Sequence, residues 1–189
     1  GVTREQLQEL LPAGGARNAI DCAFWELEAK QAGRPVWDLA GLAAPQPLLS
    51  TLTLGADAPG TMARAALALD PDAPVKVKLT GDLGEDIARV EAIRAARPDA
   101  WIGVDANQGY SIATLRELLP VLFANGVAQL EQPLARGREA DLDGLKRPLP
   151  FVADESAVTL ADTASLVGRF DVVNIKLDKC GGLTEGLAI

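Results

Sequence analysis

The stretch Val75–Leu79 reads V-K-V-K-L and alternates apolar residues with lysines. A period of two is typical of a β-strand, and it places the side chains of Lys76 and Lys78 on one face. Two ammonium groups held close together repel, which lowers their pKa values and prepares a lysine to act as a general base. On its own, the stretch also fits an exposed edge strand with solvated lysines.

Strand-like apolar runs recur on both sides of this stretch. One run begins near Leu48, and from Val75 onward successive runs begin 27, 25, 24 and 21 residues apart, at Ile102, Val127, Phe151 and Val172. The segments between the runs are predicted helices, over residues 61–69, 85–97, 112–125, 140–146 and 160–168. Strands and helices that alternate at this spacing predict right-handed crossovers and a parallel sheet.

The first 44 residues or so favour helices. Thr3 is a candidate cap for a short helix that ends near Leu11, and residues 35–41 predict a further helical turn. A longer helix is expected over residues 16–31, ended by Gly33, because its apolar residues have helical spacing. These apolar residues are Ala16, Ile20, Ala23, Phe24 and Leu27.

Composition narrows the class of protein. The chain has 189 residues, 48% of them hydrophobic, and a net charge of -8, which argues against a nucleic-acid partner. It has no apolar run of membrane-spanning length and no signal-peptide pattern at its start. Cys22 and Cys180 have neither metal-binding nor redox spacing. We therefore expect a soluble, cytoplasmic protein.

The sequence contains no histidine. This absence excludes Ser-His-Asp and Cys-His nucleophilic chemistry within the chain, and it excludes any metal site with histidine ligands. Acid–base work in an enzyme of this composition would fall to lysine, aspartate, glutamate or tyrosine.

Two architectures fit the repeating units: an open doubly wound sheet, or part of a closed (β/α)8 barrel. No G-x-G-x-x-G or Walker loop follows a predicted strand, which weakens the case for a nucleotide-binding sheet. A barrel places its chemistry at the carboxyl ends of several strands. Polar residues occupy such positions on five successive predicted strands, namely Lys76 with Lys78, then Asp105, Glu131, Asp154 and Lys176. We therefore favour a partial (TIM-type) barrel with one shared pocket.

The three carboxylates Asp105, Glu131 and Asp154 would repel one another without a counter-charge, and Mg²⁺ prefers such oxygen ligands. Each acid alone also fits a helix cap or a surface position. Strands two and six face each other across a barrel, so Lys78 and Lys176 would flank the metal. Such a metal stabilises an enediolate, and two lysines can exchange an α-proton between its faces. The predicted chemistry is racemisation or epimerisation.

Five ordered motifs resemble the enolase superfamily, in its muconate-lactonizing-enzyme subgroup. They are V-K-V-K-L, V-D-A-N-Q-G, L-E-Q-P, A-D-E-S and N-I-K-L-D-K-C-G-G-L-T-E. The helix A-R-N-A-I-D-C-A-F-W-E-L-E-A-K resembles the segment that precedes the barrel in that family. Within the subgroup, the last motif most resembles dipeptide epimerases of the L-Ala-D/L-Glu type, with Asp178 as the main discriminator. Leu52 departs from the tyrosine that many of these epimerases have there.

The resemblance implies a metal site with one Mg²⁺ per active site. Asp105, Glu131 and Asp154 match the family's Mg²⁺ ligands, and Asn107 and Glu155 match groups that orient these ligands. A lysine base combined with Mg²⁺ is a known property of the superfamily.

The resemblance also implies roles for the lysines. Lys78 and Lys176 correspond to the two acid/base catalysts, and Lys76 would contact the substrate carboxylate and lower the pKa of Lys78. Thr53 lies where related epimerases contact substrate. The implied function is Mg²⁺-dependent epimerisation of a dipeptide through a metal-stabilised enediolate. An N-succinylamino acid racemase or o-succinylbenzoate synthase, or a muconate cycloisomerase, remains an alternative.

A complete family member would be longer than this chain. Residues 1–44 correspond to the C-terminal helical part of a capping domain, and residues 45–189 to strands one to six of the barrel domain. We therefore expect a fragment of an enzyme that is a homo-oligomer at full length, with a small-molecule substrate and no membrane partner. The non-enzyme alternative is a truncated remnant that binds Mg²⁺ or a partner through open sheet edges. An unrelated open α/β sheet would keep the three carboxylates apart.

Overall fold

A computed structural model describes residues 1–189 as two compact units. The sheet unit comprises Leu49–Ser156 and Ser165–Val173. The helical unit comprises Gly1–Leu48, Ala157–Ala164 and Asn174–Ile189. The predicted domain boundary between residues 44 and 45 stays a prediction.

The sheet unit contains six parallel strands in the order β1-β2-β3-β4-β5-β6. Each strand pairs with the next one along the chain, as successive strand–helix units require. This arrangement confirms the predicted partial barrel. The strands are β1 (Leu52–Leu54), β2 (Val75–Lys78), β3 (Ile102–Asp105), β4 (Gln129–Glu131), β5 (Phe151–Ala153) and β6 (Val172–Val173).

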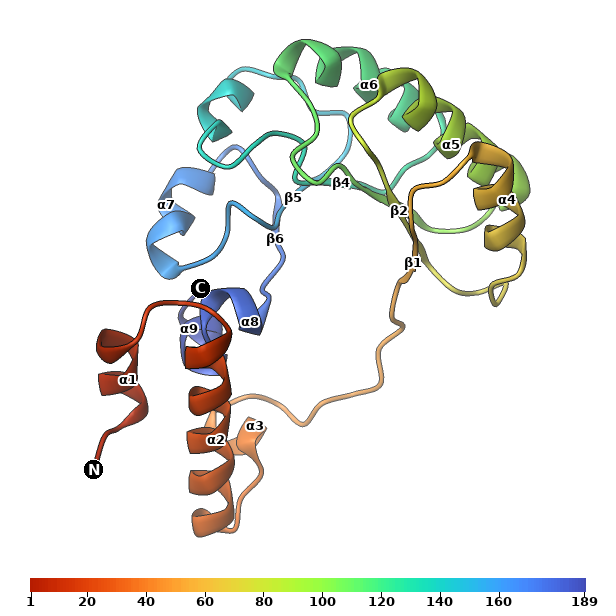
Figure 1. The fold of residues 1–189 in the computed structure, drawn as a ribbon. Helices are drawn as coiled ribbons and strands as arrows, with labels where there is room; N and C mark the ends of the chain where they lie inside the picture. Colours follow the sequence, from red (N-terminus) through yellow and green to blue (C-terminus); the bar gives the residue numbers. More distant parts are fainter. The chain divides into compact units, whose positions relative to one another are not determined.

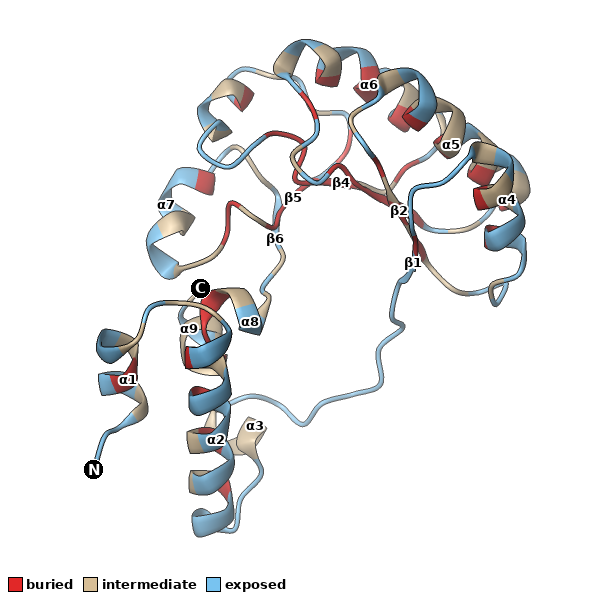
Figure 2. Cartoon of the chain, viewed as in Figure 1, coloured by how far each residue is buried: buried red, intermediate tan, exposed pale blue.

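Helices cover the convex side of this sheet (Figure 1). They are α4 (Pro59–Leu67), α5 (Leu83–Ala96) and α6 (Ile112–Ala124). Apolar residues of the inner strands, such as Val75, Val77 and Ile102, are fully buried and form one core with the inner faces of the helices. Figure 2 shows this core as buried segments on the strands and on the sheet-facing turns of the helices. Because side chains alternate along a strand, the lysines and acids lie on the other face.

Two predicted strands begin later than their apolar runs. In β1 the paired residues start at Leu52, because its single neighbour β2 begins at Val75 and offers no partner further upstream. Leu48 and Leu49 are consequently 91% and 81% exposed. Similarly, β4 starts at Gln129 rather than at Val127, because Gln129 is the first of its residues that pairs with β3, opposite Gly103.

The last two predicted helices are much shorter than expected. Instead of a helix over residues 140–146, the chain forms a single 3₁₀ turn, η1 (Glu139–Leu142), and Gly144 follows with a left-handed φ of 73°. Residues 160–168 contain the 3₁₀ turn η2 (Leu160–Asp162) and the four-residue helix α7 (Thr163–Leu166). Glycine at positive φ ends a helix readily, which limits both segments.

The helical unit contains α1 (Arg4–Leu10), α2 (Gly15–Ala32), α3 (Val36–Leu39), α8 (Leu177–Cys180) and α9 (Leu183–Ala188). Thr3 caps α1 as predicted, through a capping box with Gln6. No helix in the structure has the length and apolar character that a membrane span requires.

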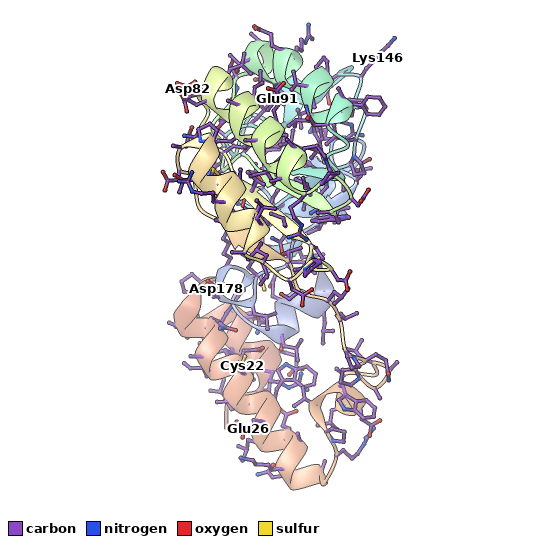
Figure 3. The ribbon with its side chains drawn as sticks, turned by 90° about the vertical axis from the view of Figure 1, so that its right-hand side faces the viewer. Cys22, Glu26, Asp82, Glu91, Lys146 and Asp178 are labelled. Atoms are coloured by element: carbon purple, nitrogen blue, oxygen red, sulfur yellow. The ribbon has the colours of Figure 1, made fainter.

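Helix α2 buries a different face from the one that its apolar residues predict. The buried residues are Arg17, Asp21, Trp25 and Ala29, whereas Ile20 and Leu27 are 42% and 50% exposed. Cys22 and Glu26 lie one turn apart on the exposed side of the helix (Figure 3). This face is buried because its side chains make polar contacts with the segment 180–185.

Those contacts involve two buried ionised side chains. Arg17 donates to the carbonyl oxygens of Cys180 and Gly181, and the Asp21 carboxylate accepts from the backbone N–H and the hydroxyl of Thr184. Gly182 has a φ of 127°, and a Cβ there would collide with the Asp21 carboxylate. The α2 helix thus clamps a glycine-containing turn by hydrogen bonds to its backbone.

Candidate active site

The carboxyl ends of β2, β3 and β4 place the predicted site residues in one row. In the sheet register Lys78 is opposite Asp105, and Asp105 is opposite Glu131. Glu131 is opposite Val152, so Asp154 lies two residues further along the neighbouring strand and just past its end. Residues in register on adjacent strands project from the same face, so the acids and lysines share the side of the sheet away from the helices.

Two lysines form ion pairs with two buried carboxylates at this edge. Lys76 Nζ lies 2.6 Å from Glu131 Oε2 and 3.1 Å from Asp105 Oδ2. Lys78 Nζ lies 2.6 Å from the same Asp105 oxygen. The carboxylates are almost fully buried, whereas the side chains of Lys76 and Lys78 are 19% and 33% exposed. The two ammonium groups therefore remain partly accessible to solvent, whereas the carboxylates that they contact are shielded from it.

These contacts exclude the simple edge-strand interpretation of V-K-V-K-L. The β2 strand lies between β1 and β3, and neither lysine is fully solvated. The four ionised groups instead form a compact alternating cluster, which we call the Lys–carboxylate cluster and define as Lys76, Lys78, Asp105 and Glu131.

The electrostatics of the cluster differ from the expectation for Lys76. Burial lowers the pKa of Lys76, but the hydrogen bond to Glu131 and the negative charges of Asp105 and Glu131 outweigh burial, so its pKa is raised. Mutual repulsion between lysines is therefore not the dominant effect on Lys76. Burial raises the pKa of Asp105, but the hydrogen bond from Lys78 and the charge of Lys76 outweigh it, and this pKa is lowered.

The predicted metal ligands have suitable chemistry, but the three carboxylates do not form a complete metal site in this structure. Asp105, Glu131 and Asp154 are 0%, 3% and 1% exposed, and Asp105 and Glu131 already share one cation, the Lys76 ammonium. Carboxylate oxygens on adjacent strands fit the donor set that Mg²⁺ prefers. No group of three acidic, histidine or cysteine side chains lies close enough in this structure to hold an ion by itself. The ligand assignment stays a prediction.

The predicted orienting and substrate-contacting residues lie at the same edge. The Asn107 side chain accepts a hydrogen bond from Lys78 at 3.0 Å, and its backbone N–H donates to Asp105 Oδ1 at 3.0 Å. Glu155 is half-buried directly after Asp154. Thr53 is exposed on β1 in register with Lys76, which places both on the same face.

Lys176 does not lie on the sixth strand, contrary to the prediction. Strand β6 ends at Val173, and Lys176 is the residue that precedes helix α8. Strand β6 has one neighbour, β5, and its pairing extends over two residues, so the sheet imposes no extended conformation further along. Lys176 belongs to the helical unit, and its proposed position across from Lys78 stays a prediction.

Sequence reasoning missed two buried polar residues next to the site. Asp86 accepts hydrogen bonds from the backbone N–H groups of Thr80 and Gly81 and from the Tyr110 hydroxyl, and so anchors the loop after Lys78. Gln132 follows Glu131 directly and is 1% exposed. For Gln132, the sequence offered one signal, its position. A polar residue that directly follows a strand-end acid, as in the L-E-Q-P motif, is expected to have little access to solvent.

Two family descriptions match the chain. Residues 1–41 match the "Mandelate racemase / muconate lactonizing enzyme, N-terminal domain", and residues 61–189 match the "Enolase C-terminal domain-like" family. The two matches correspond to the helical N-terminal segment and to the strand–helix units.

Curated relatives resemble the whole chain. An L-Ala-D/L-Glu epimerase of Escherichia coli (strain K12) is 44% identical over 191 residues, which cover 100% of this chain and 59% of that protein. An N-acetyl-D-glutamate racemase of Pseudoalteromonas sp is 43% identical over 184 residues, which cover 97% of this chain and 58% of that protein. The chain thus spans little more than half the length of these relatives.

Solved structures resemble the fold. An L-Ala-D/L-Glu epimerase superposes with a TM-score of 0.90 at 45% identity, over 100% of this chain and 59% of that one. A dipeptide epimerase of Enterococcus faecalis V583, complexed with Mg and the dipeptide L-Leu-L-Tyr, superposes with a TM-score of 0.84 at 33% identity, over 94% and 52%. With its parallel strand–helix units and its strand-end acids, the chain belongs to the enolase superfamily, in the mandelate racemase / muconate lactonizing enzyme group.

Proposed function

We propose that the protein, at its natural full length, epimerises a dipeptide by moving a proton at one α-carbon. The observation that carries this proposal is the Lys–carboxylate cluster, which brings two lysines together with buried acids at the carboxyl edge of a parallel sheet. The relatives that are named dipeptide epimerases support the substrate class. Because this chain spans 59% of its Escherichia coli relative, the proposal concerns the whole protein.

The lysines would perform the proton transfer as a pair. One of Lys78 and Lys176, as a neutral amine, takes the α-proton and becomes an ammonium group. The other starts as an ammonium group and donates a proton to the opposite face of the same carbon. The α-carbon is then inverted, no atom is gained or lost, and the reverse reaction exchanges the two roles.

The acids would support this transfer by holding Mg²⁺ through Asp105, Glu131 and Asp154. When bound, the metal supplies positive charge that stabilises the negative charge developing on the substrate carboxylate as the α-proton leaves. The shared contact of Asp105 and Glu131 with the Lys76 ammonium supports this assignment, because both carboxylates already converge on one cation. Asn107 contacts both Asp105 and Lys78, so it would orient a ligand and a catalyst together.

The remaining predicted residues would bind substrate. Lys76 is partly exposed between the two acids and would contact the substrate carboxylate, and Thr53 would line the same face from β1. Glu155 would orient the ligand set from the residue after Asp154. A cytoplasmic location, a homo-oligomeric assembly, and the absence of nucleic-acid or membrane partners stay predictions.

A second candidate function is racemisation of an N-acylated amino acid. The Pseudoalteromonas relative, named N-acetyl-D-glutamate racemase, is 43% identical and favours it. The proton transfer would be the same, because both substrate classes present a carboxylate next to the α-carbon that loses its proton. The two candidates differ only in what the pocket must recognise on the nitrogen side.

Proton NMR in D₂O with Mg²⁺ separates these functions. The natural full-length protein is incubated in parallel with L-Ala-L-Glu and with N-acetyl-D-glutamate. Deuterium entering one α-position of the dipeptide, together with a second diastereomer, is the expected result. Exchange with N-acetyl-D-glutamate alone would establish the second candidate. Absence of α-exchange from both substrates, and from a panel of other dipeptides, would contradict the proposed proton transfer.

A further inference from the structure

Gln132 has an unusual combination of burial and backbone conformation. It follows Glu131 directly, is 1% exposed, and has a left-handed φ of 38°. Non-glycine residues seldom adopt this region, and glutamine is not among the types that tolerate it best. Such a residue persists only where its surroundings over-determine it, and such positions cluster at functional sites.

The side-chain amide of Gln132 is fully hydrogen-bonded. Its Oε1 accepts from the backbone N–H groups of Asp154 and Ser156, at 3.0 and 3.1 Å. Its Nε2 donates to Leu134 O at 2.9 Å and to Ser156 Oγ at 2.8 Å. A carboxamide offers one oxygen with two lone pairs and two N–H donors, so these four bonds use its whole capacity.

The backbone of Gln132 extends the connection to both neighbouring strands. Its N–H donates to Val152 O at 2.9 Å, and its carbonyl oxygen accepts from Gln108 N at 2.8 Å. The residue therefore joins the segment after Asp105, its own strand end at Glu131 and the segment after β5. These are the three strand ends that carry the predicted metal ligands.

We propose that Gln132 is a positioning residue, whose carboxamide holds the backbone of Asp154 at the place where its carboxylate can share one divalent cation with Asp105 and Glu131. This inference rests on the proposed function. An amide suits the position because it accepts two N–H bonds and donates two bonds without adding charge. A carboxylate there would lose both donated bonds and add a fourth negative charge beside three buried or strand-end acids.

A purely structural role makes a different prediction from a positioning role. If Gln132 merely closes a turn, its loss lowers stability and leaves the intrinsic affinity of the folded protein for Mg²⁺ unchanged. If it positions Asp154, metal affinity falls even in a variant that keeps the turn. Gln132→Asn is that variant, because asparagine tolerates the left-handed region but its amide is one methylene too short to reach Asp154 and Ser156.

A matched control comes from the opposite end of the strands. Arg97 is 8% exposed and donates to the carbonyl oxygens of Ala66, Asp70, Pro71 and Ala73, outside the Lys–carboxylate cluster. Arg97→Met removes four side-chain hydrogen bonds, the same number as Gln132→Met. It therefore reproduces a loss of stability without altering the strand ends that carry the acids.

The experiment measures Mg²⁺ affinity by calorimetry and melting temperature with and without Mg²⁺, in the natural full-length protein and in Gln132→Asn, Gln132→Met and Arg97→Met. We expect Mg²⁺ affinity to fall about 10- to 100-fold in both Gln132 variants, the usual effect of losing a partner that orients metal ligands. Arg97→Met should melt earlier yet bind Mg²⁺ as the wild type does.

Three outcomes overturn the inference or its basis. Wild-type Mg²⁺ affinity in Gln132→Asn would show that the amide does not position the ligands. An equal loss of affinity in Arg97→Met would show that the effect is general destabilisation. A wild-type protein that binds no Mg²⁺ would instead refute the metal site in the proposed function, which separates that failure from the first two.

Discussion

The two units of this protein bury ionised side chains in different ways. In the sheet unit, the ammonium group of Lys76 contacts two carboxylates, and both lysines remain partly open to solvent. In the helical unit, Arg17 is 5% and Asp21 is 0% exposed. Arg17 donates mainly to backbone carbonyl oxygens, and Asp21 accepts from the Thr184 backbone N–H and from the neutral side chains of Thr184 and Gln8. The first arrangement opposes charge to charge, whereas the second surrounds each charge mainly with neutral dipoles, with one longer ion pair between Arg17 and Glu185 at 3.4 Å.

This difference distinguishes a candidate reactive site, the Lys–carboxylate cluster, from a structural contact, the hydrogen bonds of Arg17 and Asp21. A charged group whose hydrogen-bonding capacity is filled by fixed neighbours is held in one position, and it stabilises the fold. Opposed charges that reach solvent can exchange partners with a metal or substrate, as functional sites require. Burial of a charge therefore identifies function only when its partners are known, and mutations can test this distinction.

The largest expected effect is the loss of proton transfer on removing either catalytic lysine. In the natural full-length protein, Lys78→Ala and Lys176→Ala should each reduce α-proton exchange by roughly 10²- to 10⁴-fold, the usual contribution of a general acid or base. Exchange in D₂O is followed by NMR. Lys146→Ala is the control, because Lys146 is an exposed lysine of the sheet unit (Figure 3) and lies in the loop before β5, at the amino end of the strands. Wild-type exchange in either catalytic variant would refute the two-lysine proposal.

The second-largest expected effect is a loss of stability on removing Asp21 from the helical unit. Asp21→Ala leaves the Thr184 backbone N–H and the Gln8 amide without their acceptor, so the free energy of unfolding should fall by about 3 kcal/mol. Urea denaturation measures the change. Asp38→Ala removes an exposed carboxylate that pairs with Arg34, and it should leave the midpoint almost unchanged. If Asp21→Ala were as stable as the wild type, the hydrogen bonds of Asp21 would not stabilise the helical unit, contrary to this prediction.

A third effect links Asp105 to both pH and metal. Its folded pKa lies below the unfolded value, so the stability that it contributes is present above the unfolded pKa and is lost as pH falls through the folded pKa. Asp105→Asn should therefore destabilise the protein at neutral pH by about 2 kcal/mol, with the difference shrinking below about pH 4. It should also weaken Mg²⁺ binding.

Denaturation of wild type and Asp105→Asn across this pH range, with calorimetry of Mg²⁺ at neutral pH, measures both effects. Asp99→Asn is the control, because Asp99 is an exposed acid that precedes β3 at the opposite end of the strand. A stability difference independent of pH would contradict the charge pairing of Asp105. Unchanged Mg²⁺ affinity would remove Asp105 from the ligand set.

The smallest effect is expected at Thr53. Its side chain is exposed on β1, so Thr53→Ala should change stability by less than about 0.5 kcal/mol. Loss of one substrate hydrogen bond should raise KM about fivefold, the equivalent of ~1 kcal/mol. Steady-state kinetics of Thr53→Ala and of the neighbouring exposed control Thr51→Ala measure this. Identical KM values in the two variants would exclude a substrate contact at Thr53.

Much of the sheet unit could be predicted from residue patterns. Val75–Leu79 and the strand-end acids were placed correctly because a strand has a period of two and parallel strands end at one edge. The predictions were weakest at the sheet edges. Lys176 lies beyond β6 because a strand with a single neighbour extends only as far as that neighbour pairs with it.

The sequence by itself determined the family, the strand–helix repeat and the set of acids and lysines that meet at one edge, because these depend on local periodicity and chain order. Only the tertiary structure decided that α2 buries Arg17 and Asp21 instead of Ile20 and Leu27. It also decided that Lys76 has a raised pKa and that Gln132 bonds to Asp154 and Ser156. The physical reason is that hydrogen bonds and charge pairs depend on which distant segments meet, and the spacing of residues along the chain does not specify those partners.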